Sequence, residues 1–169
     1  MVRELMVTAA AVFFALATAA MAEDTAKIGE VKWFDMEGCE FCKHLMKDPH
    51  LLDNMTWEHH DISSGALSIT TVKPEYKKAY LEAQQGMMEL GQRLEKGELK
   101  PTEVRMCGHC QAWGMLLAIG AKVEHIQGES AEIVLMTSDD SVLVEKIHDF
   151  AQRNRDEMAR WEAEEKQEQ

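Results

Sequence analysis

Two CxxC motifs, Cys39-Glu40-Phe41-Cys42 and Cys107-Gly108-His109-Cys110, constrain this chain more than any other feature, and they contain all four cysteines of its 169 residues. Each follows a short apolar run and is predicted to open a helix. A CxxC at a helix start places both sulfurs on one turn, within reach of one metal ion or of each other, and the free N–H groups there favour thiolate over thiol. The motifs therefore predict a metal site, a redox pair or a disulfide.

Residues 1–22 have the pattern of a secretory signal peptide. Arg3 precedes an apolar run from Val7 to Ala20, and Ala20-Met21-Ala22 is an A-x-A cleavage site. An uncleaved membrane anchor is the alternative, but the run is short for the roughly 20 residues that span a bilayer. We expect a polar leader over 23–30 and a periplasmic or secreted protein with no membrane contact after cleavage. In such a compartment, cysteines usually serve as disulfides or metal ligands.

The balance of charge excludes some classes of partner. The chain has 18 basic and 30 acidic residues, a formal net charge of -12 at pH 7. Nucleic-acid binding needs clustered Lys and Arg, so we expect no nucleic-acid partner. The sequence has no Gly-rich phosphate loop, Ser-centred nucleophile elbow or HExxH motif, so nucleotide-binding, hydrolase and zincin functions have no support. A binding protein is expected rather than an enzyme.

Hydrophobic periodicity divides the mature chain into two halves with one order of elements. We expect strands at 31–36, 56–62 and 66–72 in the first half and at 104–106, 122–127 and 132–137 in the second, with a helix after each motif and another closing each half. This order predicts an α+β fold of two tandem ferredoxin-like (βαββα) halves with antiparallel sheet, at 31–100 and 101–161. An acidic tail follows at 162–169.

Two histidines recur at matching places, because Glu58-His59 in the first half corresponds to Glu124-His125 in the second. Two thiolates with one imidazole suit Zn(II) as well as Cu(I). The predicted ligands are Cys39, Cys42 and His59 in one site and Cys107, Cys110 and His125 in another. Alternatively, either histidine is an ordinary strand residue. His44 and His109 have no counterpart in the other half and are expected to face solvent.

Structural roles for the cysteines stay open beside these sites. All four sulfurs could meet in one Zn(Cys)4 site between the halves, because two CxxC pairs are the usual components of such a site. Each motif could instead close as a local disulfide, which restrains the chain little because its loop is short. The separation of the motifs along the chain does not decide between one site and two.

Residues 31–45, with Met36 ahead of Cys39 and Cys42, resemble the Met-x-Cys-x-x-Cys loop of the heavy-metal-associated domain family. The resemblance extends in strand order over most of residues 30–151. It implies a ferredoxin-like fold that binds Cu(I) or a related ion through the CxxC cysteines. We therefore expect an exported copper- or zinc-binding protein for metal carriage, sequestration or sensing. A partner metalloprotein is a further candidate partner.

A second resemblance supports a thiol–disulfide oxidoreductase as the alternative. The tetrapeptide Cys107-Gly108-His109-Cys110 is identical to the active site of the protein disulfide isomerases, and residues 34–43 are similar to the strand and opening helix of thioredoxin-like proteins. Each CxxC motif would then be a redox pair that acts through a mixed disulfide, and all four cysteines would be redox residues. That fold places a cis-proline downstream of the cysteines, and no proline follows Cys110.

Overall fold

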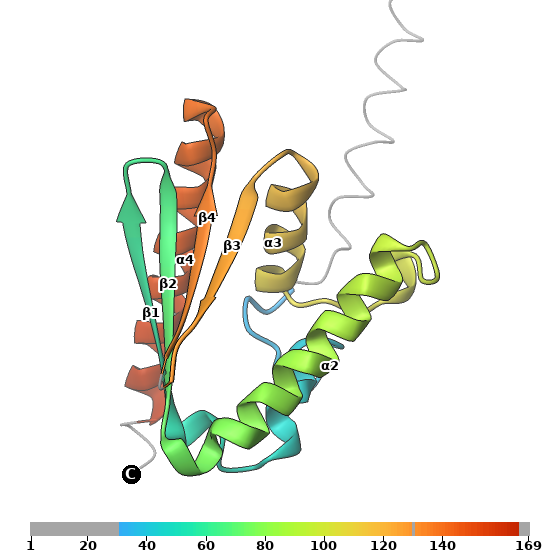
Figure 1. Cartoon of the computed structure of the whole chain (residues 1–169), viewed down its shortest axis with the longest axis vertical. Helices are drawn as coiled ribbons and strands as arrows, with labels where there is room; N and C mark the ends of the chain where they lie inside the picture. The colour runs from blue at the N-terminus through green and yellow to red at the C-terminus, as the bar shows by residue number, and fades with distance from the viewer. Residues whose placement is uncertain (1–30, 130, 166–169) are drawn as a thin grey trace, which may run out of the picture. The chain divides into compact units, whose positions relative to one another are not determined.

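The computed structural model, which describes residues 31–129 and 131–165, contains a four-stranded antiparallel sheet (Figure 1). The sheet order is β1-β2-β4-β3. Its strands are β1 (Met55–Ile62), β2 (Gly65–Val72), β3 (Lys122–Gln127) and β4 (Ala131–Thr137). The predicted α+β class and the antiparallel pairing are confirmed. The predicted signal peptide at 1–22 and leader at 23–30 lie outside the described residues.

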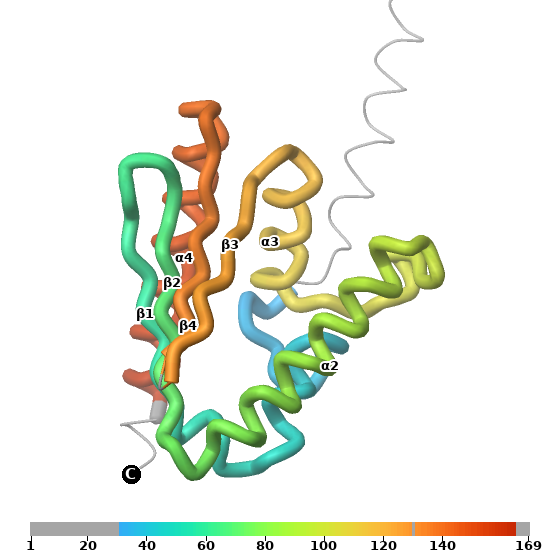
Figure 2. Tube along the Cα trace, in the orientation of Figure 1, coloured from blue at the N-terminus to red at the C-terminus, as the bar shows by residue number. Residues whose placement is uncertain are grey.

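Helices of two kinds connect and cover these strands, as the chain trace in Figure 2 shows. The α-helices are α2 (Lys77–Glu95), α3 (Gly108–Ala118) and α4 (Ser141–Glu165). The 3-10 helices are η2 (Cys42–Lys47), η3 (Leu52–Asn54), η4 (Pro74–Tyr76) and η5 (Pro101–Glu103). Pro74 and Pro101 each begin a helix, where a missing N–H costs nothing. Residues 162–165, predicted to begin the acidic tail, continue α4.

Each half contributes one hairpin to a single sheet, so two separate ferredoxin-like halves are not shown. The hairpins are β1-β2 and β3-β4, and they join where β2 pairs with β4. Leu67 faces Leu135 in that pairing, and Ile69 faces Ile133. The expected order of motif, hairpin and helix is present in both halves, but each half supplies two strands rather than three.

The first strand predicted for each half is absent, and this part of the prediction is wrong. Residues 31–36 and 104–106 form no strand. Instead, the carbonyl groups of Lys32 and Trp33 accept hydrogen bonds from Gly108 and His109 at the start of α3. Trp33 and Met36, two of the apolar residues that predicted the strand at 31–36, pack instead against buried clusters. The segment 32–35 therefore lies beside the second motif rather than in a sheet.

The main core lies between the sheet and α4. Alternation along β2 and β4 turns one face of each strand toward this helix, which supplies an apolar stripe in return. The buried residues of this core are Ala66, Leu116, Met136, Leu143, Ile147, Phe150 and Ala151. A second buried cluster joins η2 to α2 through Leu45, Leu51, Val72, Tyr80 and Ala83. The first cluster holds α3 through Leu116 and the second holds η2 through Leu45, and these are the two elements at the cysteine motifs.

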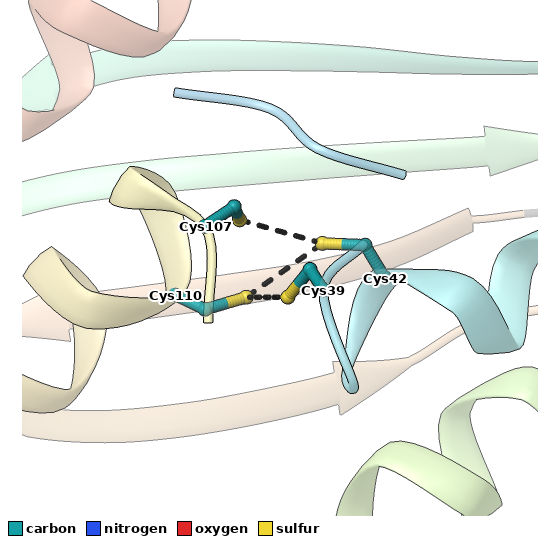
Figure 3. A group of neighbouring side chains, drawn as sticks. All are labelled: Cys39, Cys42, Cys107 and Cys110. Atoms are coloured by element: carbon teal, nitrogen blue, oxygen red, sulfur yellow. Dashed lines mark hydrogen bonds between the residues drawn. The ribbon is translucent and has the colours of Figure 1, made fainter. Parts of the chain in front are cut away.

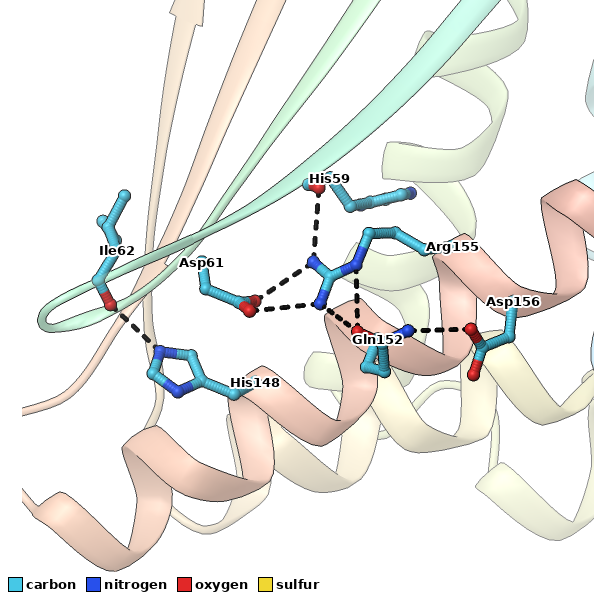
Figure 4. Close-up of polar contacts among 7 residues, drawn as sticks. All are labelled: His59, Asp61, Ile62, His148, Gln152, Arg155 and Asp156. Atoms are coloured by element: carbon cyan, nitrogen blue, oxygen red, sulfur yellow. Dashed lines mark hydrogen bonds and ion pairs between the residues drawn. The ribbon is translucent and has the colours of Figure 1, made fainter.

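Polar contacts also fasten α4 to the edge strand β1 (Figure 4). The guanidinium of Arg155 donates to both carboxylate oxygens of Asp61 at 3.1 Å, and to the His59 carbonyl at 3.3 Å. His148 Nε2 donates to the Ile62 carbonyl at 3.0 Å. The hydrogen bond from Arg155 holds the pKa of Asp61 below its ordinary value. Because the pair is partly exposed, it contributes at most about 1 kcal/mol.

Two glycines of α2 provide a matched test of how this helix packs. A Cβ on Gly86 would lie 2.2 Å from His44 Nδ1, whereas a Cβ on Gly91 would meet nothing within 4 Å. We expect Gly86→Ala to lower the free energy of unfolding by about 1–3 kcal/mol through overpacking. Gly91→Ala should raise it by about 0.5–1 kcal/mol through helix propensity. Urea unfolding measures both, and a stabilising Gly86→Ala would contradict the close packing of α2 on η2.

Candidate metal centre

The four cysteine sulfurs meet at one place, between the turn that precedes η2 and the start of α3 (Figure 3). All four sulfur atoms lie within 4.8 Å of one another. Cys39 Sγ lies 3.6 Å from Cys110 Sγ, and Cys42 Sγ lies 3.6 Å from Cys107 Sγ and 3.7 Å from Cys110 Sγ. Each of these contacts joins the first motif to the second. The structure therefore unites the two motifs in one cluster.

The spacing of the sulfurs fits a tetrahedral ion. Zinc binds thiolate sulfur at about 2.3 Å, and a regular tetrahedron with that radius has edges of about 3.8 Å. The three sulfur–sulfur contacts of 3.6, 3.6 and 3.7 Å are close to this edge length. Four sulfur donors in tetrahedral order are typical of zinc or iron rather than of hard cations. The cluster therefore has the donor set and the dimensions of a Zn(Cys)4 site.

A turn, rather than the predicted helix, positions the first motif. Cys39 N–H donates to the Asp35 carbonyl at 3.0 Å, and Lys43 N–H donates to the Cys39 carbonyl at 3.0 Å. Regular structure begins at Cys42, as the 3-10 helix η2. From the other motif's side, the Arg105 carbonyl accepts the Glu40 N–H at 2.9 Å. The first pair of sulfurs is thus held by a turn that is bonded to the residues preceding the second pair.

The second motif opens a helix, as the sequence predicts. Cys107 is the N-cap residue with extended backbone, and α3 begins at Gly108. The first N–H groups of a helix lack partners inside it. Here, Gly108 N–H donates to the Lys32 carbonyl and His109 N–H to the Trp33 carbonyl, both at 3.0 Å. A Cβ on Gly108 would lie 3.0 Å from Trp33 Cε3, so this glycine permits the close approach.

Burial closes the site on most sides. Cys39, Cys42 and Cys107 are 0%, 6% and 1% exposed, and Cys110 is half-buried. The side chains of Met36 and Phe41 pack against the cluster. Structural zinc sites are closed in this way, whereas catalytic sites keep a position open for water or substrate. The burial of the sulfurs therefore favours a retained ion over an open reactive centre.

The electrostatics of the cluster favour a cation. Hydrogen bonds from neighbouring thiols, first that of Cys107, hold the pKa of Cys39 well below its ordinary value. Hydrogen bonding from Cys110 lowers the pKa of Cys107 to about 7. The pKa values of Cys42 and Cys110 are raised, first by their hydrogen bonds with Cys107 and further by burial. Some sulfurs therefore stay protonated when others ionise, and a divalent ion would displace the remaining protons.

The two predicted histidine ligands lie elsewhere on the hairpins. His59 Nδ1 lies 2.8 Å from Ser68 Oγ, and His125 Nδ1 lies 2.9 Å from Glu132 Oε1. The buried Glu132 carboxylate also accepts hydrogen bonds from Tyr80 and Gln84. Within the described ranges, the ligand group that the structure assembles consists of the four cysteines alone. The geometry joins the two predicted sites into one, and the role of either histidine as a ligand stays a prediction.

The sequence-based placement of His109 in solvent is wrong. Its ring packs against Phe34 and Phe150, with centroid distances of 5.4 and 5.0 Å, and its Nδ1 lies 2.9 Å from Asn154 Oδ1. Burial lowers the pKa of His109. The contact with Asn154 spans 45 residues, and a single asparagine in a polar stretch of helix gives no signal of it in the sequence.

Comparisons with known proteins give no match that assigns a function. The chain matches no protein-family model, no curated protein and no solved structure. No heavy-metal-associated domain is identified, so what supports metal binding is the cysteine cluster itself. Within the described part of the chain, no helix combines the length and apolar character that crossing a membrane requires.

The environment of His59 predicts a pH dependence of stability. Burial first, and then the charges of His109, Arg155 and His60, lower the pKa of His59 to about 4 from an ordinary 6.5. The unfolded chain therefore binds a proton between pH 6.5 and 4 that the folded chain does not. We expect this residue to remove up to about 1.4 kcal/mol of stability per pH unit as the pH falls through that window.

Urea unfolding of the wild type and of His59→Gln at pH 7 and pH 5 measures this contribution. The wild type should lose more stability than the variant between the two pH values. His60→Gln, at an exposed position next in the strand, is the control and should lose more stability than His59→Gln between the two pH values. Equal losses in the wild type and in His59→Gln would show that His59 does not titrate as its burial predicts.

Proposed function

We propose that this protein binds one zinc ion through Cys39, Cys42, Cys107 and Cys110. The observation that carries the proposal is the meeting of four sulfurs, all within 4.8 Å, from motifs in different halves of the chain. Four thiolates in tetrahedral order suit Zn(II). Copper(I) remains the competitor, because it is also a soft ion that thiolates bind.

The bound ion would cross-link the two halves of the fold. The first pair of ligands precedes the β1-β2 hairpin, and the second pair begins α3, which leads into the β3-β4 hairpin. A ligand that binds only the folded state stabilises it by an amount that grows with the logarithm of the ratio of free ligand to Kd. Zinc would therefore hold the turn at Cys39 against the first residues of α3. The four cysteines must release their protons on binding, so affinity should fall at low pH.

Among the metal-handling functions, we propose sequestration or sensing in an exported protein. The predicted signal peptide at residues 1–22 supports export to the periplasm or the exterior. Rapid carriage to a partner metalloprotein needs an accessible coordination position, whereas three of the four sulfurs here are buried. Cys110 is half-buried, so an ion or a partner's thiolate would reach the centre from the side on which Cys110 lies.

Thiol–disulfide exchange is the second candidate function. The pKa of Cys107, lowered to about 7, supports it, because thiolate is the attacking species. Two observations favour metal binding over it. Cys107 is 1% exposed, and the sulfur contacts join the two motifs to each other. An exchange pair needs a solvent-accessible attacking sulfur.

Metal analysis of anaerobically purified mature protein tests the proposal. We expect one zinc per chain, and we expect its removal with a strong chelator to lower the thermal midpoint by about 10 °C. That shift corresponds to about 3 kcal/mol in a domain of this size. Two ions per chain would support separate sites in the two motifs. Metal-free protein with both pairs oxidised would overturn zinc binding and support the oxidoreductase.

Single substitutions identify the ligands. Cys42→Ser and Cys107→Ser should each abolish stoichiometric zinc binding, because each removes one of four thiolates and leaves an incomplete site. His59→Ala and His125→Ala are the matched controls, and they should retain one zinc with wild-type affinity. A tenfold loss of affinity in either histidine variant would assign that imidazole to the metal and contradict the all-cysteine site.

A further inference from the structure

His109 lies inside the second motif but is bonded to a different part of the fold. Its ring stands edge-on to Trp33, with a centroid distance of 6.1 Å and an interplanar angle of 89°. Phe34 and Phe150 contact the same ring. Asn154 of α4, which is 0% exposed, accepts a hydrogen bond from it. The residue between the two ligands of α3 therefore connects the segment 32–34, α3 and α4.

The hydrogen bonds at Asn154 fix the tautomer of this histidine. Trp33 Nε1 lies 2.8 Å from Asn154 Oδ1, and His109 Nδ1 lies 2.9 Å from the same atom. An indole N–H can only donate, so the atom that faces it is the amide oxygen. A carbonyl oxygen can only accept, so His109 Nδ1 must carry a hydrogen. In the neutral ring, Nε2 is then unprotonated.

The main chain of His109 bonds to Trp33, and the indole of Trp33 shares its acceptor with the His109 ring. Its N–H donates to the Trp33 carbonyl at 3.0 Å, while its ring shares Asn154 Oδ1 with the Trp33 indole. These bonds close a ring of contacts around the first turn of α3. Rotation of that turn would break both bonds, and it would also displace the sulfurs that flank His109.

We propose that His109 is a positioning residue of the metal centre, whose Nδ1–H bond to Asn154 holds Cys107 and Cys110 where they meet the first motif. This inference rests on the proposed zinc binding. The docking of α4 does not depend on the bond, because the buried core and the Arg155–Asp61 pair also attach α4 to the sheet. Loss of the bond should therefore weaken metal retention more than folding.

Two substitutions of His109 separate the hydrogen bond from the packing of the ring. His109→Phe keeps an aromatic ring and removes the donor, while Asn154 Oδ1 keeps its bond from Trp33. His109→Asn removes the ring and offers an amide donor near the position of Nδ1. We expect zinc-loaded His109→Phe to transfer its ion to excess chelating dye at least about tenfold faster than the wild type, which is the order of the loss that removing an outer-shell partner of a metal site causes.

Asn154 supplies the second arm of the experiment. Asn154→Leu removes the acceptor and should accelerate transfer as much as His109→Phe does, and the double variant should be no faster than either single variant. Asn154→Asp keeps an acceptor oxygen and should retain zinc. If His109→Phe does not fold, the comparison of Asn154→Leu with Asn154→Asp tests the same bond. Trp33→Phe disturbs the same aromatic cluster but leaves the His109 bond, so its transfer rate should stay near that of the wild type.

Spectroscopy gives a readout that loss of general packing would not produce. The imidazole 15N spectrum of the wild type should show His109 protonated at Nδ1 alone. The cobalt-substituted His109→Phe and Asn154→Leu proteins should share one altered ligand-field spectrum, with His109→Asn close to the wild type.

Three results would overturn the inference while zinc binding stands: wild-type transfer rates in His109→Phe, equal acceleration in Trp33→Phe, or an Nε2-protonated His109. A wild-type chain that takes up no zinc would overturn the proposed function and the inference together.

Discussion

The reciprocal bonding of two backbone segments is the interaction on which the rest of the site depends. The carbonyls of Lys32 and Trp33 cap the first N–H groups of α3, and the Arg105 carbonyl accepts the N–H of Glu40. Each motif thus donates hydrogen bonds to carbonyl groups in the segment that precedes the other motif. Without these bonds, the N–H groups at the start of α3 would be buried unpaired, at a cost of about 1–3 kcal/mol each. These bonds fix the backbones of both motifs, so the sulfurs meet although neither 31–36 nor 104–106 forms a strand.

Much of the local structure was predictable because local patterns decide it. The strand predicted at 122–127 is observed with the same bounds, and the helices predicted to close the two halves are α2 and α4. The segment 31–36 was predictable only as apolar. Its partners are the N–H groups of Gly108 and His109, more than 70 residues away, and no periodicity in the sequence encodes that pairing. The choice between one cysteine site and two depends on the same long-range contact.

The repeated histidines share a position in the strand order of the two halves, but their surroundings differ. His59 and His125 occupy matching places in the two hairpins, but their partners differ: a serine hydroxyl in one and a buried carboxylate in the other. Glu132 is 5% exposed, and a carboxylate at that depth needs several donors. His125 provides one of them, beside Tyr80 and Gln84 of α2. The requirement of Glu132 for donors gives His125 a role in the fold of its own.

The two motifs are alike in spacing but are held by different structures, and this difference matters for the charge of the centre. Zinc with four thiolates carries a net charge of about -2, which is unfavourable in a chain of net charge -12. The second motif places two sulfurs at the N-terminus of α3, where the helix dipole favours negative charge by about 0.3–1 kcal/mol. The first motif, held by a turn before a 3-10 helix, contributes less of this stabilisation. The start of α3 is therefore the part of the site whose position most affects the stability of an anionic centre.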